Sequence, residues 1–185
     1  LGIAREHLIP YGDDKAKIAL ALCDIRLADE MEKTKPLAPV LKQVVYWGDA
    51  SQGSLESLMA RPGYETFSAC DTASDDVCLI GSTSGTTGEP KGTMHCHRDI
   101  LATCDTYGRH VLRAAPDDRF IGSPPLAFTF GLGGLVLFPL RFGASTILLE
   151  KAPPDELLPA IAKWRATVCF TAPMAYRAML GALSA

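Results

Sequence analysis

Hydroxyl, glycine and lysine side chains gather in one short stretch of the chain, residues 82–92. These eleven residues include five hydroxyl side chains, three glycines and one lysine, and they follow an apolar run at residues 77–80. Glycine lets the backbone approach a ligand closely. Hydroxyls, backbone N–H groups and a lysine are donors suited to phosphate oxygens. The stretch therefore predicts a phosphate-binding loop, with a flexible Ser/Gly linker as the alternative.

Two common nucleotide-binding templates do not describe this loop. A Walker-type loop needs a lysine directly after a glycine, whereas Lys91 follows Pro90. A kinase glycine loop needs the pattern G-x-G-x-x-G, and Gly85 and Gly88 lack its first pair. The residue types thus indicate phosphate binding, but neither template identifies a nucleotide-binding family.

Two other stretches carry residues that could form a site. Residues 124–131 hold two prolines, two phenylalanines and a glycine, which predict a rigid apolar loop. Phe128 and Phe130 either line a pocket there or pack in the core. His95 and His97 would share one face of an extended segment. Two ligands make a poor metal site, so we expect no metal to be bound there.

Strands and helices alternate along the rest of the chain. Short apolar runs predict strands at residues 17–23 (buried), 43–47, 77–81, 119–122, 145–149 and 166–170. The alanines of residues 17–23 would also suit a helix. Helical spacing predicts helices at residues 25–33, 97–110, 132–142, around 157–164 and 173–180, and a short helix that begins at residue 55 and is stopped by Pro62. This alternation predicts an α/β fold with a mostly parallel sheet flanked by helices. The loop would leave the carboxyl end of the strand at 77–81, where open α/β sheets bind ligands.

A few residues set the ends of these elements. Asp24 and Ser54 are suited to begin helices, and Gly143 is suited to end one. Pro159 lacks the N–H that a helix interior uses, so we expect it in the first turn of its helix.

Length and composition limit the class of protein. The chain has 185 residues, of which 48% are hydrophobic, and a net charge of −3. It has no block of basic residues, so nucleic acid and membrane surfaces are not expected partners. The apolar run at 132–140 is too short to span a bilayer. Six scattered cysteines favour free thiols in a reducing compartment, and we expect a cytoplasmic protein.

The loop resembles the phosphate-loop signature of the adenylate-forming superfamily, which includes acyl-CoA synthetases, luciferase-like enzymes and peptide-synthetase adenylation domains. The similarity runs over ten consecutive positions, residues 83–92, and a weaker echo follows at His97 and Arg98. The resemblance assigns these residues to ATP phosphate binding: Thr83, Ser84, Gly85, Thr86, Thr87, Gly88 and Lys91. It also implies that Lys91 supplies charge to the transition state.

Residues 122–134 resemble the family's next motif, which lines the acyl pocket. The resemblance places four residues in the substrate pocket: Ala127, Phe128, Phe130 and Gly131. Many relatives have a histidine where this sequence has Phe128, so an acid–base role at that position is not expected. A phenylalanine there is similar to the benzoate and 2-aminobenzoate CoA ligases.

The resemblance implies a two-step ligase reaction. ATP and an aromatic carboxylate give an acyl adenylate and pyrophosphate, and CoA then displaces AMP to give a thioester. ATP, Mg²⁺ and CoA are the implied co-substrates, and the sequence offers no certain Mg²⁺ ligand. A homodimer of the whole protein is also among the expectations.

The resemblance further implies that residues 1–185 are a single partial domain. Enzymes of the family are expected to be roughly three times as long, with a C-terminal lid domain that lies outside this chain. We therefore expect the chain alone not to complete adenylation. Two alternatives stay open, a medium-chain or other acyl-CoA synthetase and a non-catalytic anion-binding module.

Overall fold

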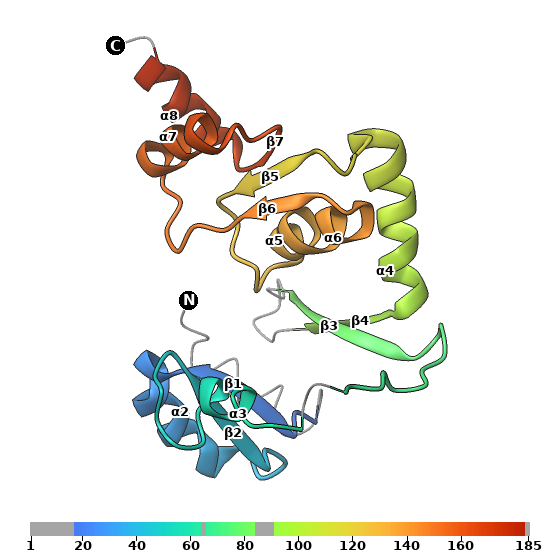
Figure 1. Ribbon diagram of the computed structural model, residues 1–185, viewed down its shortest axis with the longest axis vertical. Coiled ribbons are helices and arrows are strands. Elements are labelled where there is room, and N and C mark those ends of the chain that lie inside the picture. The colour runs from blue at the N-terminus through green and yellow to red at the C-terminus, as the bar shows by residue number, and fades with distance from the viewer. Residues whose placement is uncertain (1–16, 64–65, 84–90, 184–185) are drawn as a thin grey trace. The chain divides into compact units, whose positions relative to one another are not determined.

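The computed structural model describes residues 17–63, 66–83 and 91–183 and divides the chain into two compact units (Figure 1). The first unit comprises Leu1–Thr72 and Ser82–Thr93, and the second comprises Ala73–Gly81 and Met94–Ala185. Strands and helices alternate in both units, which confirms the predicted α/β class.

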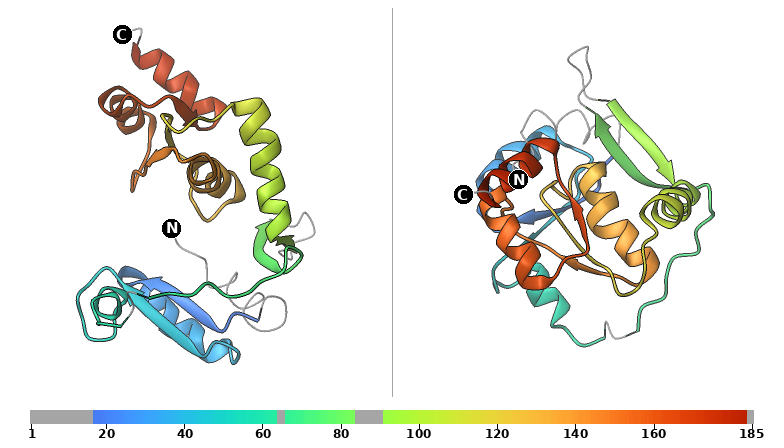
Figure 2. Two further views of the ribbon diagram at one scale, coloured as in Figure 1. Left: turned by 45° about the vertical axis from the view of Figure 1, so that its right-hand side comes forward. Right: turned by 90° about the horizontal axis from the view of Figure 1, so that it is seen from above.

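The first unit is built on a parallel pair of strands, β1 (Leu20–Asp24) and β2 (Gln43–Trp47). Helical segments follow each strand and pack beside the pair (Figure 2). Their bounds are η2 (Ile25–Leu27), α2 (Ala28–Thr34), η3 (Lys35–Leu37) and α3 (Leu55–Met59). The bounds of β2 are those predicted from the sequence, and α3 begins directly after Ser54 as predicted.

Both predicted helix starts in the first unit are confirmed. The Asp24 carboxylate accepts a hydrogen bond from the Arg26 N–H at 2.9 Å, and Ser54 Oγ accepts one from the Ser57 N–H at 3.2 Å. Hydrogen bonds from Arg26 hold the pKa of Asp24 below its usual range. These side chains satisfy backbone donors that have no partner inside a helix.

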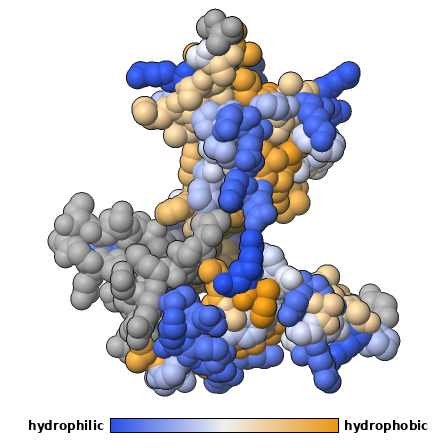
Figure 3. Space-filling model, turned by 90° about the vertical axis from the view of Figure 1, so that its left-hand side faces the viewer, coloured by the Kyte–Doolittle hydropathy of each residue, from blue (hydrophilic) through white to orange (hydrophobic). Residues whose placement is uncertain are grey.

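The expectation that residues 17–23 form a buried strand is wrong in part. The strand begins at Leu20, and only Cys23 is buried, whereas Leu20 is 54% and Leu22 is 60% exposed. A pair of strands with short helices has too little material to cover both faces. Apolar side chains therefore remain at the surface, as the orange areas of Figure 3 illustrate.

The second unit contains a three-stranded parallel sheet in the order β6–β5–β7. The strands are β5 (Arg119–Gly122), β6 (Ser145–Ile147) and β7 (Val168–Phe170). The helices that surround it are α4 (His97–Thr103), η4 (Cys104–Leu112), α5 (Thr129–Leu132), η5 (Gly133–Leu137), α6 (Phe138–Phe142), α7 (Pro154–Trp164) and α8 (Pro173–Leu183). In the described part of the chain, no helix is long and apolar enough to cross a membrane.

The core of the second unit lies on both faces of β5. Successive strand residues point to opposite faces, and both Phe120 and Ile121 are 0% exposed. Phe120 belongs to a cluster with Cys104, Phe138 and Phe170. Ile121 belongs to a second cluster, formed with Leu157 and Met179. The sheet is therefore the middle layer between α4 to α6 on one side and α7 and α8 on the other (Figure 1).

Two expectations about helices in the second unit are wrong. The apolar loop expected through residue 131 ends at Phe128, because α5 begins at Thr129. Pro159 lies in the interior of α7 and not in its first turn, because Pro154 already begins that helix. The helix end predicted at Gly143 is confirmed, with a left-handed φ of 71° that suits glycine.

The two strands that flank the glycine-rich loop pair with each other. β3 (Val77–Thr83) and β4 (Lys91–Cys96) form a separate two-stranded sheet. Among the described residues, β3 does not join a parallel sheet, so the expected position of the loop at the edge of one is wrong. The pairing of β3 with β4 brings the two ends of the loop together instead.

The cysteines differ in exposure, which predicts an order of reactivity. Cys70 and Cys78 are exposed, whereas Cys23 and Cys104 are buried. Burial raises the pKa of the Cys23 and Cys104 thiols, so less of the reactive thiolate forms. In the native protein, we expect alkylation to label Cys70 and Cys78 first. Peptide mass spectrometry measures the order, and fast native labelling of Cys104 would contradict the packing of its cluster.

Candidate functional site

The glycine-rich loop is bounded by paired strands. Thr83 is the last residue of β3, and Lys91 is the first residue of β4, where its side chain is exposed. The remaining predicted phosphate ligands lie outside the described residues: Ser84, Gly85, Thr86, Thr87 and Gly88. Their role, and that of Thr83 and Lys91, stays a prediction.

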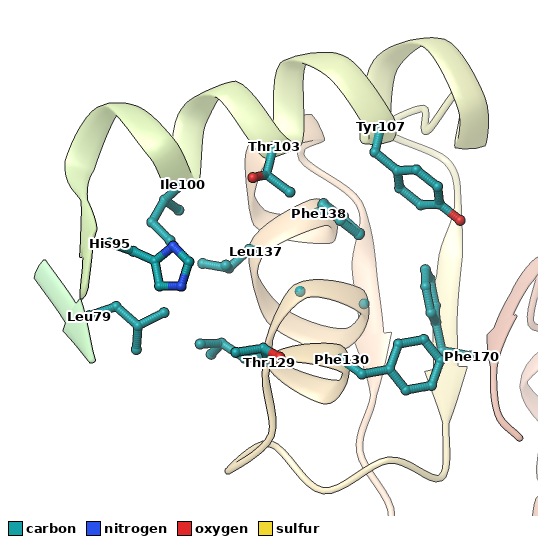
Figure 4. Close-up of a pocket in the computed structure, with 13 residues that line it drawn as sticks. Leu79, His95, Ile100, Thr103, Tyr107, Thr129, Phe130, Leu137, Phe138 and Phe170 are labelled. Atoms are coloured by element: carbon teal, nitrogen blue, oxygen red, sulfur yellow. The ribbon is translucent and has the colours of Figure 1, made fainter. Parts of the chain in front are cut away.

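A cavity of about 310 Å³ lies within the second unit. The strand residues Leu79 and His95 line one part of it, and helical residues line most of the rest (Figure 4). The helical and β7 residues are Ile100, Thr103, Tyr107, Thr129, Phe130, Leu132, Gly133, Gly134, Leu137, Phe138 and Phe170. The lining is mainly apolar and aromatic, which is typical of small-molecule pockets.

Helical spacing explains why these residues share one cavity. Ile100, Thr103 and Tyr107 are separated by three and four positions, so they lie along one side of the continuous helix formed by α4 and η4. The helix formed by α5, η5 and α6 has cavity residues at the same spacing, namely Phe130, Gly133 or Gly134, and Leu137. Two helix faces therefore oppose each other across the cavity (Figure 4).

Four aromatic rings form a continuous wall at one end of the cavity. The Phe130 and Phe170 ring centroids are 5.6 Å apart in an edge-to-face arrangement, and Phe138 lies 6.2 Å from Phe170. Tyr107 is 5.6 Å from Phe138. Such spacings are favourable for aromatic pairs, and the same edges and faces would suit an aromatic ligand.

An ion pair and a close contact fix the two helices that border the cavity. Asp105 accepts hydrogen bonds from Arg141 at 2.8 Å and from Arg109 at 2.9 Å, joining η4 to α6. These two guanidinium groups hold the pKa of Asp105 below its usual range. At Gly108 an added Cβ would lie 2.6 Å from the Phe142 ring, so glycine permits the close approach.

Both helices contain a π-helical segment beside the cavity. Tyr107 belongs to η4, and Gly133, Gly134 and Leu137 belong to η5. Such segments often occur at functional sites. At Gly134 an added Cβ would lie 2.6 Å from the Phe170 ring, so the bare backbone makes room for that ring.

Of the four predicted pocket residues, the structure brings Phe130 into this cavity. Ala127 and Phe128 precede α5 and are exposed, and Phe128 has 60% of its surface accessible. Gly131 is buried against the Pro125 carbonyl. These three residues do not line the cavity, and their role in substrate binding stays a prediction.

Sequence reasoning missed His95 as a cavity residue. We considered it only as a metal ligand beside His97, yet its imidazole points into the cavity beside Leu79 and Leu137 (Figure 4). A polar residue on a strand next to a predicted phosphate loop was the available signal. Among the described residues, no three His, Cys, Asp or Glu side chains gather as a metal site requires.

Comparison with known proteins places this geometry in a family. The AMP-binding enzyme family matches residues 7–185. The benzoate–CoA ligase of Thauera aromatica is 35% identical over 143 residues, which are 77% of this chain and 27% of that enzyme. The anthranilate–CoA ligase of Pseudomonas aeruginosa is 31% identical over 159 residues, which are 84% of this chain and 30% of that enzyme.

The fold agrees with this assignment. The crystal structure of the anthranilate CoA ligase AuaEII in complex with anthranoyl-AMP matches with a TM-score of 0.81 and 29% sequence identity. The match covers 92% of this chain and 33% of that one, so the chain spans about a third of the length of such relatives. With the family match extending over nearly all of its residues, the chain belongs to the AMP-binding enzyme family, the adenylate-forming enzymes.

Proposed function

We propose that the protein carrying this chain activates an aromatic carboxylic acid. In the first step, a carboxylate oxygen attacks the α-phosphorus of ATP and releases pyrophosphate, which leaves an acyl adenylate. In the second step, the CoA thiolate attacks the acyl carbon and releases AMP, which leaves an acyl-CoA thioester. The substrate class we propose is benzoate or a substituted benzoate such as 2-aminobenzoate.

The observation that carries this proposal is the aromatic cavity of the second unit. Its volume of about 310 Å³ is near the lower end of the range typical for small-ligand pockets, which suits a single ring. The wall of Phe130, Phe170, Phe138 and Tyr107 offers ring faces and edges to an aromatic acid. Relatives named as benzoate and anthranilate ligases support the same substrate class.

The loop at residues 82–92 has the composition that the first step needs. A carboxylate must approach a polyanion, so the phosphates have to be held and partly neutralised. Backbone N–H groups at Gly85 and Gly88 and the nearby hydroxyls would donate to phosphate oxygens, and Lys91 would add a positive charge. Mg²⁺ would accompany the nucleotide, and we assign it no ligand from this chain.

A panel of acids tests the substrate class. In the protein that carries this chain, carboxylate-dependent exchange between ATP and pyrophosphate should be faster with benzoate and aminobenzoates than with acetate or hexanoate. Isothermal titration with each acid gives a second measure that needs no turnover. A preference for aliphatic acids would favour a medium-chain enzyme, and absence of exchange with any acid would favour an anion-binding module.

A further inference from the structure

His95 is a polar side chain at an otherwise aliphatic end of the cavity. Its imidazole lies beside Leu79, Ile100 and Leu137, and all four side chains are half-buried (Figure 4). The aromatic wall, with Phe130 and Phe170, lies at the other end of the cavity. A ligand that fills the cavity would therefore contact rings at one end and an imidazole at the other.

The imidazole has hydrogen-bonding capacity to spare. Within the described ranges, the His95 side chain makes no hydrogen bond to another residue, and the contact from Cys78 Sγ at 3.5 Å goes to its backbone carbonyl. Thr103 also lines the cavity, but its hydroxyl already donates to the Asp99 carbonyl at 2.9 Å. Tyr107 lies toward the aromatic end (Figure 4). The Thr103 hydroxyl can therefore only accept a further hydrogen bond, whereas the His95 imidazole can offer both a donor and an acceptor.

We propose that His95 is a specificity-determining residue, whose imidazole binds a hydroxyl or amino substituent on the ring of the aromatic acid. This inference rests on the proposed function. A neutral imidazole has one donor and one acceptor nitrogen, which matches a hydroxyl or an amino group. A site that hydrogen-bonds a substituent discriminates against analogues that lack it, because its own polar group is then unpaired.

The surroundings favour a neutral substituent over the carboxylate at His95. Three aliphatic side chains would strip water from a carboxylate there, and desolvating a charge costs far more than desolvating a hydroxyl. Thr129 and Phe130 in the lining are exposed, in contrast to the half-buried His95 end, so a carboxylate would keep more of its water beside them.

The test compares ring substituents in the protein that carries this chain. Specificity constants for ATP–pyrophosphate exchange are measured with benzoate and with hydroxy-, amino- and methyl-substituted benzoates. At the ring position that reaches His95, the hydroxy or amino acid should be favoured about 10-fold over its methyl analogue, the typical discrimination for one hydrogen bond. Because the methyl analogue has nearly the same shape, this comparison needs no protein variant.

Protein variants then assign the discrimination to the imidazole. His95→Leu should reduce the hydroxy-to-methyl ratio about 10-fold, and His95→Gln should restore part of the ratio. His110→Leu is the matched control, because His110 is exposed on η4 and does not line the cavity.

Four outcomes would overturn the inference. The first is that the hydroxy or amino acid is favoured over its methyl analogue at no ring position. The second is that the hydroxy-to-methyl ratio stays unchanged in His95→Leu. Either result excludes the role of the imidazole and leaves the proposed function intact. If His95→Leu lowers the specificity constant equally for every acid, His95 would instead bind the carboxylate or have a structural role. Exchange with aliphatic acids alone would overturn both this inference and the proposed function.

Discussion

Replacing Lys91 with alanine should slow formation of the acyl adenylate by about 100-fold, the usual effect of losing one donor that stabilises transition-state charge. Lys91 lies near the end of the loop at residues 82–92, where β4 begins, and has an exposed side chain. If its ammonium group neutralises phosphate charge, the variant should also need more ATP. Rapid-quench measurement of adenylate formation at varied ATP concentration gives both quantities.

The second half-reaction provides the internal control for Lys91. Thioester formation from a preformed acyl adenylate involves no β- or γ-phosphate, so Lys91→Ala should leave it nearly unchanged. Lys42→Ala removes another exposed lysine outside the loop and should affect neither step. Equal slowing of both steps in Lys91→Ala would exclude a role confined to phosphate binding.

Replacing Gly131 with alanine should destabilise the fold by about 3 kcal/mol, at the upper end of the usual cost of overpacking. An added Cβ at Gly131 would lie 2.1 Å from the Pro125 carbonyl oxygen and 2.7 Å from that of Pro124. These are backbone atoms, so the contact cannot be relieved by a change of side-chain rotamer. The segment before α5 would have to move, and chemical denaturation measures the loss.

Gly133→Ala is the matched variant for this effect. Gly133 lies two residues further along the same continuous helix, and an added Cβ would be 3.6 Å from the Phe138 ring, an ordinary contact. Alanine favours a helix over glycine by about 1 kcal/mol at either position. We therefore expect Gly133→Ala to be neutral or stabilising, and equal stability of the two variants would contradict the tight packing at Gly131.

Features set by neighbouring residues could be predicted from the sequence. Asp24 and Ser54 begin helices through side-chain bonds to N–H groups two or three residues away, and both were identified. The bounds of β2 were also identified, because a run of β-branched and aromatic residues stops at a glycine. Each of these signals lies within the segment it describes.

Features set by distant contacts could not be predicted in this way. The pairing of β3 with β4 depends on which strand is available as a neighbour, and the run of apolar residues in β3 is also typical of a strand in a parallel sheet. The π-helical segments η4 and η5 have no composition that separates them from α-helix. The position of Pro159 inside α7 depends on the helix starting as early as Pro154, which the helical spacing of residues 157–164 does not indicate.

The candidate site also contains one residue that a local motif predicts and one that distant contacts define. Phe130 was identified from its motif, and the cavity contains it. His95 was not, because two of its neighbours in the cavity, Leu79 and Leu137, are distant in sequence. The spacing of His95 and His97 raised only the question of a metal, which two ligands made a poor expectation, whereas the environment of the imidazole favours an organic ligand.

The central position of β5 has a consequence for how this protein folds as it is synthesised. The first residue of β5, Arg119, bonds to Thr167 just before β7, which is 48 residues further along the chain. Phe120 and Ile121 must therefore leave the ribosome long before their second neighbouring strand exists. Parallel pairs need such long connections and form slowly. Helices between β5 and β7 can form earlier because their contacts are local, so the nascent chain exposes an apolar strand that chaperones would protect.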